Sequence, residues 1–429
     1  MTSFLSSVSV RLFGTHSAFT GLLPVVLAVF LSFLAVSVPL AALALEVRDH
    51  LGFGGLTVGW VIGAQSLATL LTRHQAGTLC DQRGPRAAVL LGLPLTASSG
   101  LAYALSGMLP IDPVGKVVVL LLGRLVAGFG ESLFLTGLMS WGISRVGVAR
   151  TGKVMSWTGI AIYAALGLGA PLGLAIQGAY GFAGVGLLAL VTPMLAWAIA
   201  VRLSAVPATG GQREPFHRVL GLIWRPGLVL ALATVPYATM AAFLTLDYAA
   251  HGWPHAGTAL LGFGAAYVFV RLVGSSLPDR IGASKVAVGS LGFEAAGQVL
   301  IWSASAPSMA VLGATLTGLG FSLVFPAMGV MATRSVPPEQ RGRAVGSFIA
   351  FADIALGVTG PAVGFATQWF GISAAFLVGT AATCAALCLL PSLRLGGSCC
   401  RSLFPPMMVT ISANIEISTL LPTPCAVAC

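Results

Sequence analysis

Two acidic side chains and one basic side chain interrupt long apolar stretches of this sequence. Arg124 and Glu131 lie within one stretch, and Asp353 lies within another. A charged group near the centre of a bilayer costs about 3 kcal/mol, so such groups are rare and usually line a path for a solute or a proton. We therefore predict that Arg124, Glu131 and Asp353 line such a path, and that Glu131 or Asp353 binds and releases the proton.

Arg124, Gly128 and Glu131 follow one face of a helix, because their spacing is i, i+4 and i+7. The rise between the two charged residues is about 10.5 Å, which is too long for a direct salt bridge. The gap could hold water, a proton or a polar solute. The alternative is that each charged side chain pairs with a neighbouring helix and only stabilises the bundle.

A second concentration of charge lies in the segment "GTLCDQRGPR", from Gly77 to Arg86. Glycine permits a tight turn, and Asp81 can accept hydrogen bonds from the amides at a helix N-terminus or from an arginine elsewhere. We predict that this segment is a loop that acts as a conformational latch. The alternative for Arg83 and Arg86 is that they only fix the membrane topology.

The chain repeats itself. Arg73, Asp81 and Gly84 recur 198 residues later, and a second set, which includes Gly167 and Pro171, recurs 190 residues later. The change of 8 predicts a longer connection between the third and fourth spans of the first half. The same offset of 190 places Tyr163 opposite Asp353, on the predicted path. The predicted latch then comprises both copies of the charged segment: Arg73, Gly77, Asp81, Arg83, Gly84, Arg86, Arg271, Asp279, Arg280 and Gly282.

The composition explains what positions these residues. Of the 429 residues, 57% are hydrophobic and 8% are charged, whereas soluble domains carry about 25% charged residues. Apolar runs long enough to cross a bilayer recur throughout. We predict an all-α polytopic membrane protein with twelve transmembrane helices, at 18–42, 57–74, 88–108, 117–139, 153–177, 183–203, 227–249, 257–276, 286–305, 309–331, 345–368 and 373–391.

The basic residues predict the orientation, because positive charge favours cytoplasmic loops. Only Arg48 and Lys116 lie on connections of one parity. Thirteen lie on or beside the other: Arg83, Arg86, Arg145, Arg150, Arg202, Arg213, Arg218, Arg225, Arg280, Lys285, Arg334, Arg341 and Arg343. Both termini are therefore expected in the cytoplasm. The net charge of +10 reflects this topology, and we expect no nucleic-acid partner.

We divide the chain into five parts. Residues 1–17 are a cytoplasmic N-terminus, 18–203 the first six-helix half, 204–226 a cytoplasmic linker, 227–391 the second half, and 392–429 a tail without a clear span. Six of the seven cysteines follow residue 383, and none lies at metal-ligand spacing from a histidine. We expect no metal and no cofactor. Asp247, at the end of the seventh span, is expected at the membrane interface, and Glu294 has no predicted role.

Three motifs carry a family resemblance. The repeated charged segment resembles the signature loop of the major facilitator superfamily, "GRLVAGFGES" resembles its motif in span 4, and "GLGAPLG" its motif in span 5. "GESLFLTGLMSWGISRVG" and "FADIALGVTGPAVG" are similar to the YhhS-type branch of bacterial inner-membrane transporters. The resemblance implies two homologous six-helix halves and a location in the bacterial inner membrane.

Glycine and proline are frequent at equivalent positions of spans 5 and 11. Small residues let membrane helices approach closely, and proline can bend a helix. We predict that these residues pack between the two halves and permit rocking: Gly167, Gly169, Pro171, Gly173, Gly357, Gly360 and Pro361. The alternative is ordinary helix packing.

The predicted function is that of a secondary active transporter, since no phosphate-binding loop for ATP is present. We expect a monomer in the lipid bilayer that moves a small solute by alternating access, with proton-coupled efflux. The alternative is a proton-coupled importer or facilitator of a sugar-like solute. A polytopic membrane enzyme or sensor is a more distant alternative, because the six histidines are scattered and form no catalytic group.

Overall fold

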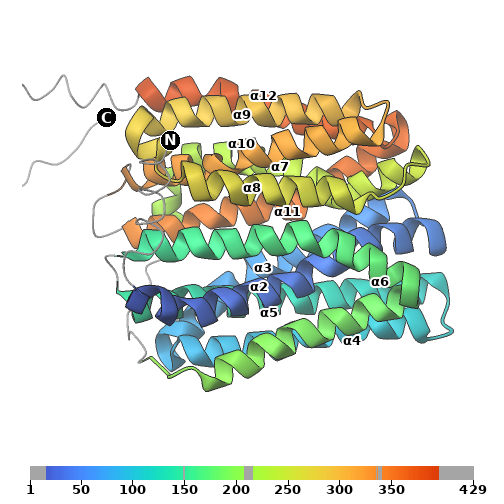
Figure 1. The fold of residues 1–429 in the computed structure, drawn as a ribbon, viewed down its shortest axis with the longest axis horizontal. Helices are drawn as coiled ribbons and strands as arrows, with labels where there is room; N and C mark the ends of the chain where they lie inside the picture. Colours follow the sequence, from blue (N-terminus) through green and yellow to red (C-terminus); the bar gives the residue numbers. More distant parts are fainter. Residues whose placement is uncertain (1–15, 148–149, 207–215, 335, 337–340, 396–429) are drawn as a thin grey trace, which may run out of the picture.

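The computed structural model describes residues 16–147, 150–206, 216–334, 336 and 341–395. The described residues form long α-helices and two short π-helical segments, and they contain no β-strand. Figure 1 shows two bundles of roughly parallel helices, one built from α2 to α6 and the other from α7 to α12. Most of the predicted N-terminus (1–17), the centre of the predicted linker (204–226) and most of the predicted tail (392–429) lie outside the described residues.

The first bundle contains five α-helices and one π-helical segment, joined by short turns. They are α2 (His16–Leu45), η1 (Glu46–His50), α3 (Gly55–Arg83), α4 (Pro85–Met108), α5 (Pro113–Val146) and α6 (Thr151–Arg202). α6 is 52 residues long, or about 78 Å at 1.5 Å per residue, enough to cross a hydrocarbon core of about 30 Å twice. Gly181, with φ 69°, kinks it between the two crossings.

The second bundle contains six α-helices. They are α7 (Phe216–Ala250), α8 (Gly257–Gly274), α9 (Ala283–Trp302), α10 (Pro307–Arg334), α11 (Arg341–Phe370) and α12 (Ala374–Leu395), with η3 (Pro278–Gly282) between α8 and α9. Six crossings in each bundle confirm the predicted all-α fold of two six-helix halves.

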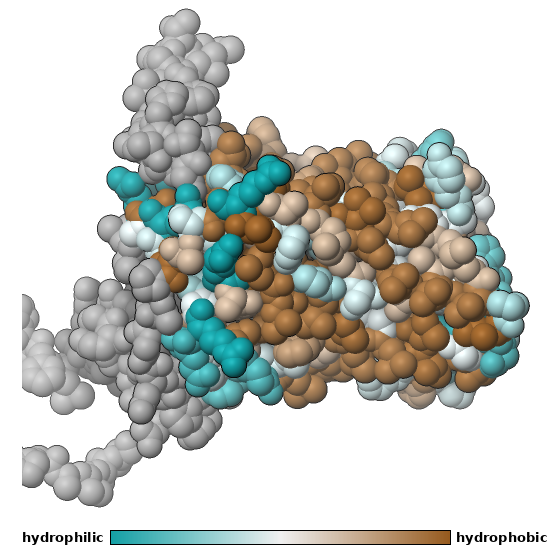
Figure 2. Space-filling model, turned by 90° about the horizontal axis from the view of Figure 1, so that it is seen from below, coloured by the Kyte–Doolittle hydropathy of each residue, from teal (hydrophilic) through white to brown (hydrophobic). Residues whose placement is uncertain are grey.

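The surface and the helix lengths agree with a membrane location. Ten described helices are long and apolar enough to cross a membrane. Figure 2 shows a broad hydrophobic band with hydrophilic residues gathered towards the ends of the molecule. We call the end where α2 begins and α12 ends the basic end, because Arg83, Arg86 and Lys285 lie there. The other is the η1 end (Figure 1).

The predicted loop from Gly77 to Arg86 is mostly helical, so that prediction was wrong. α3 continues to Arg83, and Gly77 is buried inside it. The chain turns only at Gly84, whose φ of 84° is a conformation that residues with a Cβ rarely adopt. Gly282, its counterpart in the second half, has φ 97°.

The offset between the repeats arises from helix length, and the prediction of a longer connection was wrong. The turns are equally long, at 109–112 and 303–306. α4 has 24 residues against 20 in α9. Gly128 follows the start of α5 by 15 residues, whereas Gly318 follows the start of α10 by 11. Each helix of the first hairpin is therefore longer by four residues, about one turn.

Asp247, which the sequence predicts to be at the membrane interface, lies near the η1 end of α7 and is buried there. Its residue surface is 1% exposed, and its Oδ1 accepts a hydrogen bond of 2.6 Å from the Ser373 hydroxyl. Ser373 begins the turn into α12, so this bond joins two helices of the second half.

A buried apolar cluster closes the η1 end between the halves. It contains Leu43 and Val58 of the first half together with Phe243, Leu246 and Val363 of the second. Burial of side chains from both halves in one cluster removes apolar surface from water and stabilises their contact at this end.

Candidate functional site

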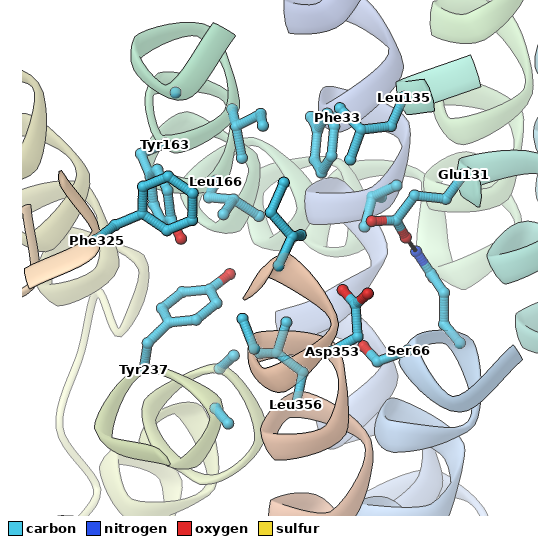
Figure 3. Close-up of a pocket in the computed structure, with 18 of the residues that line it drawn as sticks. Phe33, Ser66, Glu131, Leu135, Tyr163, Leu166, Tyr237, Phe325, Asp353 and Leu356 are labelled. Atoms are coloured by element: carbon cyan, nitrogen blue, oxygen red, sulfur yellow. Dashed lines mark hydrogen bonds between the residues drawn. The ribbon is translucent and has the colours of Figure 1, made fainter. Parts of the chain in front are cut away.

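A cavity of ≈ 190 Å³ lies between the two halves. Side chains from α2, α3, α5 and α6 of the first half and from α7, α8, α10 and α11 of the second line it. In Figure 3 the carboxylates of Glu131 and Asp353 lie on one side, while Tyr163, Tyr237 and Phe325 lie on the other. The cavity therefore has a charged wall and an aromatic wall.

An ion pair between the halves forms part of the charged wall. Arg73 of α3 donates from Nη2 to Oδ2 of Asp353 on α11, and both residues line the cavity. Arg73 was predicted as part of the latch and Asp353 as part of the path. The structure brings them together, and it places Arg73 in the cavity rather than at the charged turn.

Glu131 makes its hydrogen bond within the first half. Its Oε2 accepts a bond of 2.6 Å from Nε2 of Gln65 on α3. Arg124, two turns earlier on α5, donates from Nε to the Val61 carbonyl at 3.1 Å and from Nη2 to the Ile62 carbonyl at 2.9 Å. Arg124 and Glu131 thus both bind α3, and they form no direct salt bridge with each other, in keeping with their spacing.

The aromatic wall contains the lining residues Tyr163, Tyr237, Tyr267, Phe321 and Phe325, and Phe263 packs against it without lining the cavity. Tyr163 of α6 stacks on Tyr267 of α8 with ring centroids 3.8 Å apart, and Tyr237 of α7 stacks on Phe263 at 5.1 Å. Phe321 of α10 contacts Tyr163 edge to face at 5.6 Å. The hydroxyl of Tyr237 points into the cavity (Figure 3). The wall offers flat apolar surface with hydroxyl groups at its edge.

Arg271 also lines the cavity, although it was predicted as part of the latch. It donates from Nη1 to the Ser322 carbonyl at 3.0 Å, and its guanidinium carbon lies 5.6 Å from the centroid of the Tyr267 ring. A cation over a tyrosine face is attracted by the ring quadrupole. Arg271 therefore supports the Tyr163–Tyr267 stack.

The contacts between α3 and α11 change along their length. Near the η1 end, a Cβ added to Gly59 would overlap the Gly360 backbone, and one added to Gly63 would meet the Gly357 carbonyl and Pro361. Nearer the basic end, the contact is the Arg73–Asp353 ion pair. The two helices are thus in backbone contact near the η1 end and joined by an ion pair nearer the basic end.

The equivalent contact between α6 and α8 also has close backbone contact near the η1 end and a side-chain contact nearer the basic end, but the side chains differ. Gly167 meets Gly264, and Pro171 meets Gly257, near the η1 end. The Tyr163–Tyr267 stack then takes the place of the ion pair. Gly169 and Gly173 instead face Ser37 and Val38 of α2, so for these two the prediction of a position between the halves was wrong.

The remaining latch residues lie at the basic end. Asp81 is partly buried in the last turn of α3, whereas Arg83 is exposed. Arg86, in the first turn of α4, donates to the Val201 carbonyl at 3.0 Å. In the second half, Asp279 and Arg280 of η3 are both exposed. The two copies of the segment therefore differ in burial.

Sequence reasoning missed several cavity residues. Gln65 is an amide within an apolar span, a signal that could have been noticed. Tyr237 and Tyr267 gave no comparable signal, because aromatic residues are common in apolar helices. Glu294 lies outside the cavity. It is fully buried on α9 against Gly320 of α10, and neither carboxylate oxygen has a partner among the described residues.

No metal site is apparent in the part of the chain that the structure describes, where no three or more His, Cys, Asp or Glu residues are grouped to hold an ion.

Three comparisons place the fold and the sequence among known proteins. A family model described as Major Facilitator Superfamily matches residues 25–254 and 248–396. An uncharacterized MFS-type transporter of Pseudomonas aeruginosa (strain LESB58) is 42% identical over 370 residues, covering 86% of this chain and 92% of the relative. One of Salmonella typhimurium is 40% identical over 372 residues, covering 87% and 95%. The crystal structure of a mutant of the nucleoside transporter NupG superposes with a TM-score of 0.69 at 14% identity, covering 87% of this chain and 99% of that one.

Proposed function

Since the chain belongs to the major facilitator superfamily of membrane transporters, we propose that it is a proton-coupled secondary transporter that exports a small amphiphilic solute by alternating access. The observation that carries the proposal is the cavity between the halves, with two carboxylates on one wall and an aromatic surface on the other. Transporters of this superfamily bind solutes between their repeated halves, near the middle of the membrane.

The lining supports an amphiphilic solute over a sugar. A sugar needs hydrogen bonds on most of its faces, whereas Phe33, Leu135, Leu166, Phe325 and Leu356 cover much of this cavity with apolar surface. An amphiphilic solute, including a weak acid in its uncharged form, can also enter a cell across the bilayer without a protein, so export is the direction in which a transporter is useful. This supports efflux over import.

The distribution of charge supports a bacterial inner-membrane location with the basic end in the cytoplasm. The η1 end is closed by the apolar cluster and by the glycine contacts of α3 with α11. The cavity lining continues towards the basic end, to Met139 of α5 and Met155 of α6. We assign this arrangement to an inward-facing state.

Two carboxylates support proton coupling in different ways. Asp353 is paired with Arg73 across the halves, so a proton that neutralises it would release α11 from α3. Glu131 is bound to Gln65 within the first half and sits near the charges of Arg73, Arg124 and Asp353. Rocking of the halves would move these charges relative to Glu131 and so change how tightly it binds a proton.

Solute-driven proton movement in inverted membrane vesicles tests the proposal. We expect that amphiphilic solutes, but not sugars, dissipate an imposed proton gradient reported by a pH-sensitive dye. Glu131→Gln should abolish gradient-driven transport while retaining solute binding and exchange. Asp112→Asn is the matched control, because Asp112 caps α5 far from the cavity and asparagine is an equally good cap. Undiminished proton-coupled flux in both Glu131→Gln and Asp353→Asn would reject coupling through this cavity.

A further inference from the structure

The cavity carries more positive than negative formal charge. Three arginines line it against two carboxylates, a difference of +1 with both carboxylates ionised. Arg73 and Asp353 compensate each other. Arg124 and Arg271 form no ion pair with a carboxylate among the described residues, so Glu131 alone faces two further cations. A proton on Glu131 raises the excess of positive charge.

Arg124 and Arg271 each have one guanidinium nitrogen without a partner among the described residues, but only Arg271 also has an aromatic ring against its guanidinium. Arg124 is 2% exposed, and both of its hydrogen bonds go to neutral backbone carbonyls. Its Nη1 has no partner among the described residues. Removal of a guanidinium from water is costly unless an anion or a full set of acceptors replaces the water. An anionic group bound in the cavity would supply the negative charge and the hydrogen-bond acceptor that the described residues do not give to Arg124.

Arg271 has a different environment. Its guanidinium lies over the Tyr267 ring and donates to the Ser322 carbonyl, so it is held against the aromatic wall. Arg124 belongs to the opposite wall. Arg124 therefore places a site for an anionic group across the cavity from a flat aromatic surface.

Tyr237 connects the two walls. Its ring stacks with Phe263, and its hydroxyl points into the cavity (Figure 3), which Arg124 and Glu131 also line. A planar solute packed against Tyr163 and Tyr237 would therefore have its polar end near Arg124. Aromatic pairs contribute to binding beyond the burial of their surface, and a guanidinium can hold a carboxylate with two parallel hydrogen bonds.

We propose that the transported solute is an amphiphilic organic anion, with a planar apolar body that packs on the tyrosines and a carboxylate that pairs with Arg124. This rests on the transport function proposed above and names the substrate class of the same cavity.

Three matched probes test this preference: naphthalene-2-carboxylate, its neutral carboxamide and the cationic naphthalen-2-ylmethylamine. Binding of the tritiated compounds to the full chain in detergent is measured by equilibrium dialysis at neutral pH and corrected for uptake by empty micelles. We expect the carboxylate to bind about tenfold more tightly than the carboxamide, and the amine to bind most weakly. Equal binding of the three compounds, tighter binding of the amine, or no saturable binding of any of them overturns the proposal.

Variants test which side chain causes the preference for the carboxylate over the carboxamide. Arg124→Gln should make carboxylate and carboxamide bind equally, while Arg124→Lys should retain part of the preference. Tyr163→Leu should weaken both compounds by a similar factor and leave their ratio unchanged. Lys153→Gln is the matched control, because it removes an exposed positive charge outside the cavity.

The comparison of the unmodified chain with Arg124→Lys remains decisive if Arg124→Gln does not fold. A lost carboxylate preference with intact proton flux rejects the anionic solute only. A retained preference without proton flux rejects the coupling and leaves the binding site in place.

Discussion

Arg73 and Asp353 join the two halves through one ion pair within the cavity. Their side chains are 19% and 11% exposed, so the pair is only partly screened by solvent. Glu131, in contrast, is hydrogen-bonded within its own half. At this scale we propose separable roles for the two carboxylates: Asp353 would couple protonation to the contact between the halves, and Glu131 would couple it to the solute.

Single and double substitutions at the ion pair test this separation. Asp353→Asn and Arg73→Gln should each lower the free energy of unfolding by about 2 kcal/mol, between the values for exposed and fully buried pairs, because each leaves one charge uncompensated. The double variant should recover most of the stability but none of the proton-driven flux. Thermal unfolding in detergent and flux in vesicles provide the two measurements. Additive losses of stability in the double variant would show that the pair is not coupled.

At the scale of elements, α3 lines the cavity and also connects it to the contact with α11 and to the charged turn. Its η1 end is in backbone contact with α11 through glycines, its middle carries Gln65 and Arg73, and its last turn carries Asp81. A carboxylate in the last turn of a helix is unfavourable for that helix, because the dipole there is negative. Asp81 does, however, precede the N-terminus of α4, where a carboxylate is favourable. This supports a role at the junction of the two helices rather than in the stability of α3.

Asp81→Asn tests the latch. We expect transport to fall several-fold while folding and membrane insertion are unchanged, because the substitution removes a charge at a helix junction and empties no core. Asp279→Asn should be milder, since Asp279 is exposed whereas Asp81 is partly buried. Transport rates in vesicles, normalised to the amount of inserted protein, check both. Wild-type transport by Asp81→Asn would exclude the latch.

Gly59→Ala tests the closure at the η1 end. The added Cβ would overlap the Gly360 carbonyl, and such overpacking costs about 1–3 kcal/mol. We expect the closed η1 end to open more often, so that reagents reach the cavity from that side. In a variant without the seven native cysteines, a cysteine at Ser66 in the cavity should react faster with an impermeant maleimide added from the η1 side. Gly289→Ala is the matched control, because nothing lies within 4 Å of its added Cβ. Equal labelling rates in the two variants would contradict this expected opening.

At the scale of the whole molecule, the two halves repeat in sequence and structure but not in chemistry. The 198- and 190-residue offsets relate Arg73 to Arg271 and Asp353 to Tyr163. One contact between the halves therefore holds an ion pair, and its counterpart holds stacked tyrosines. We propose that a proton acts directly on the first contact and not on the second, so that protonation controls only one of the two equivalent contacts.

The orientation of the whole molecule is testable with reporter fusions. Fusions after Gly210 in the linker and at the C-terminus should both read as cytoplasmic, because the basic residues gather at that end. A fusion after Gly252, in the turn between α7 and α8 at the η1 end, should read as periplasmic. A periplasmic reading at either of the first two positions would overturn the topology.

The all-helical class, the membrane location, the six-and-six repeat and the approximate helix positions could all be predicted from the sequence. This is possible because the requirement for an apolar run to cross a bilayer is local: it depends on about 20 consecutive residues and on nothing elsewhere in the chain. Arg124, Glu131 and Asp353 could also be predicted to line a path, since each is costly in its own span, whereas Arg73 and Arg271 were assigned to the latch.

The contacts among these residues could be found only from the tertiary structure. Arg73 and Asp353 are 280 residues apart, Gly169 and Gly173 face α2 while Gly167 faces α8, and the tyrosines converge from three helices on one wall. Hydrophobicity drives a segment into the bilayer, but apolar side chains pack about as well against lipid as against another helix. The face that each helix turns to its neighbours is therefore set by close packing and hydrogen bonds among all the helices.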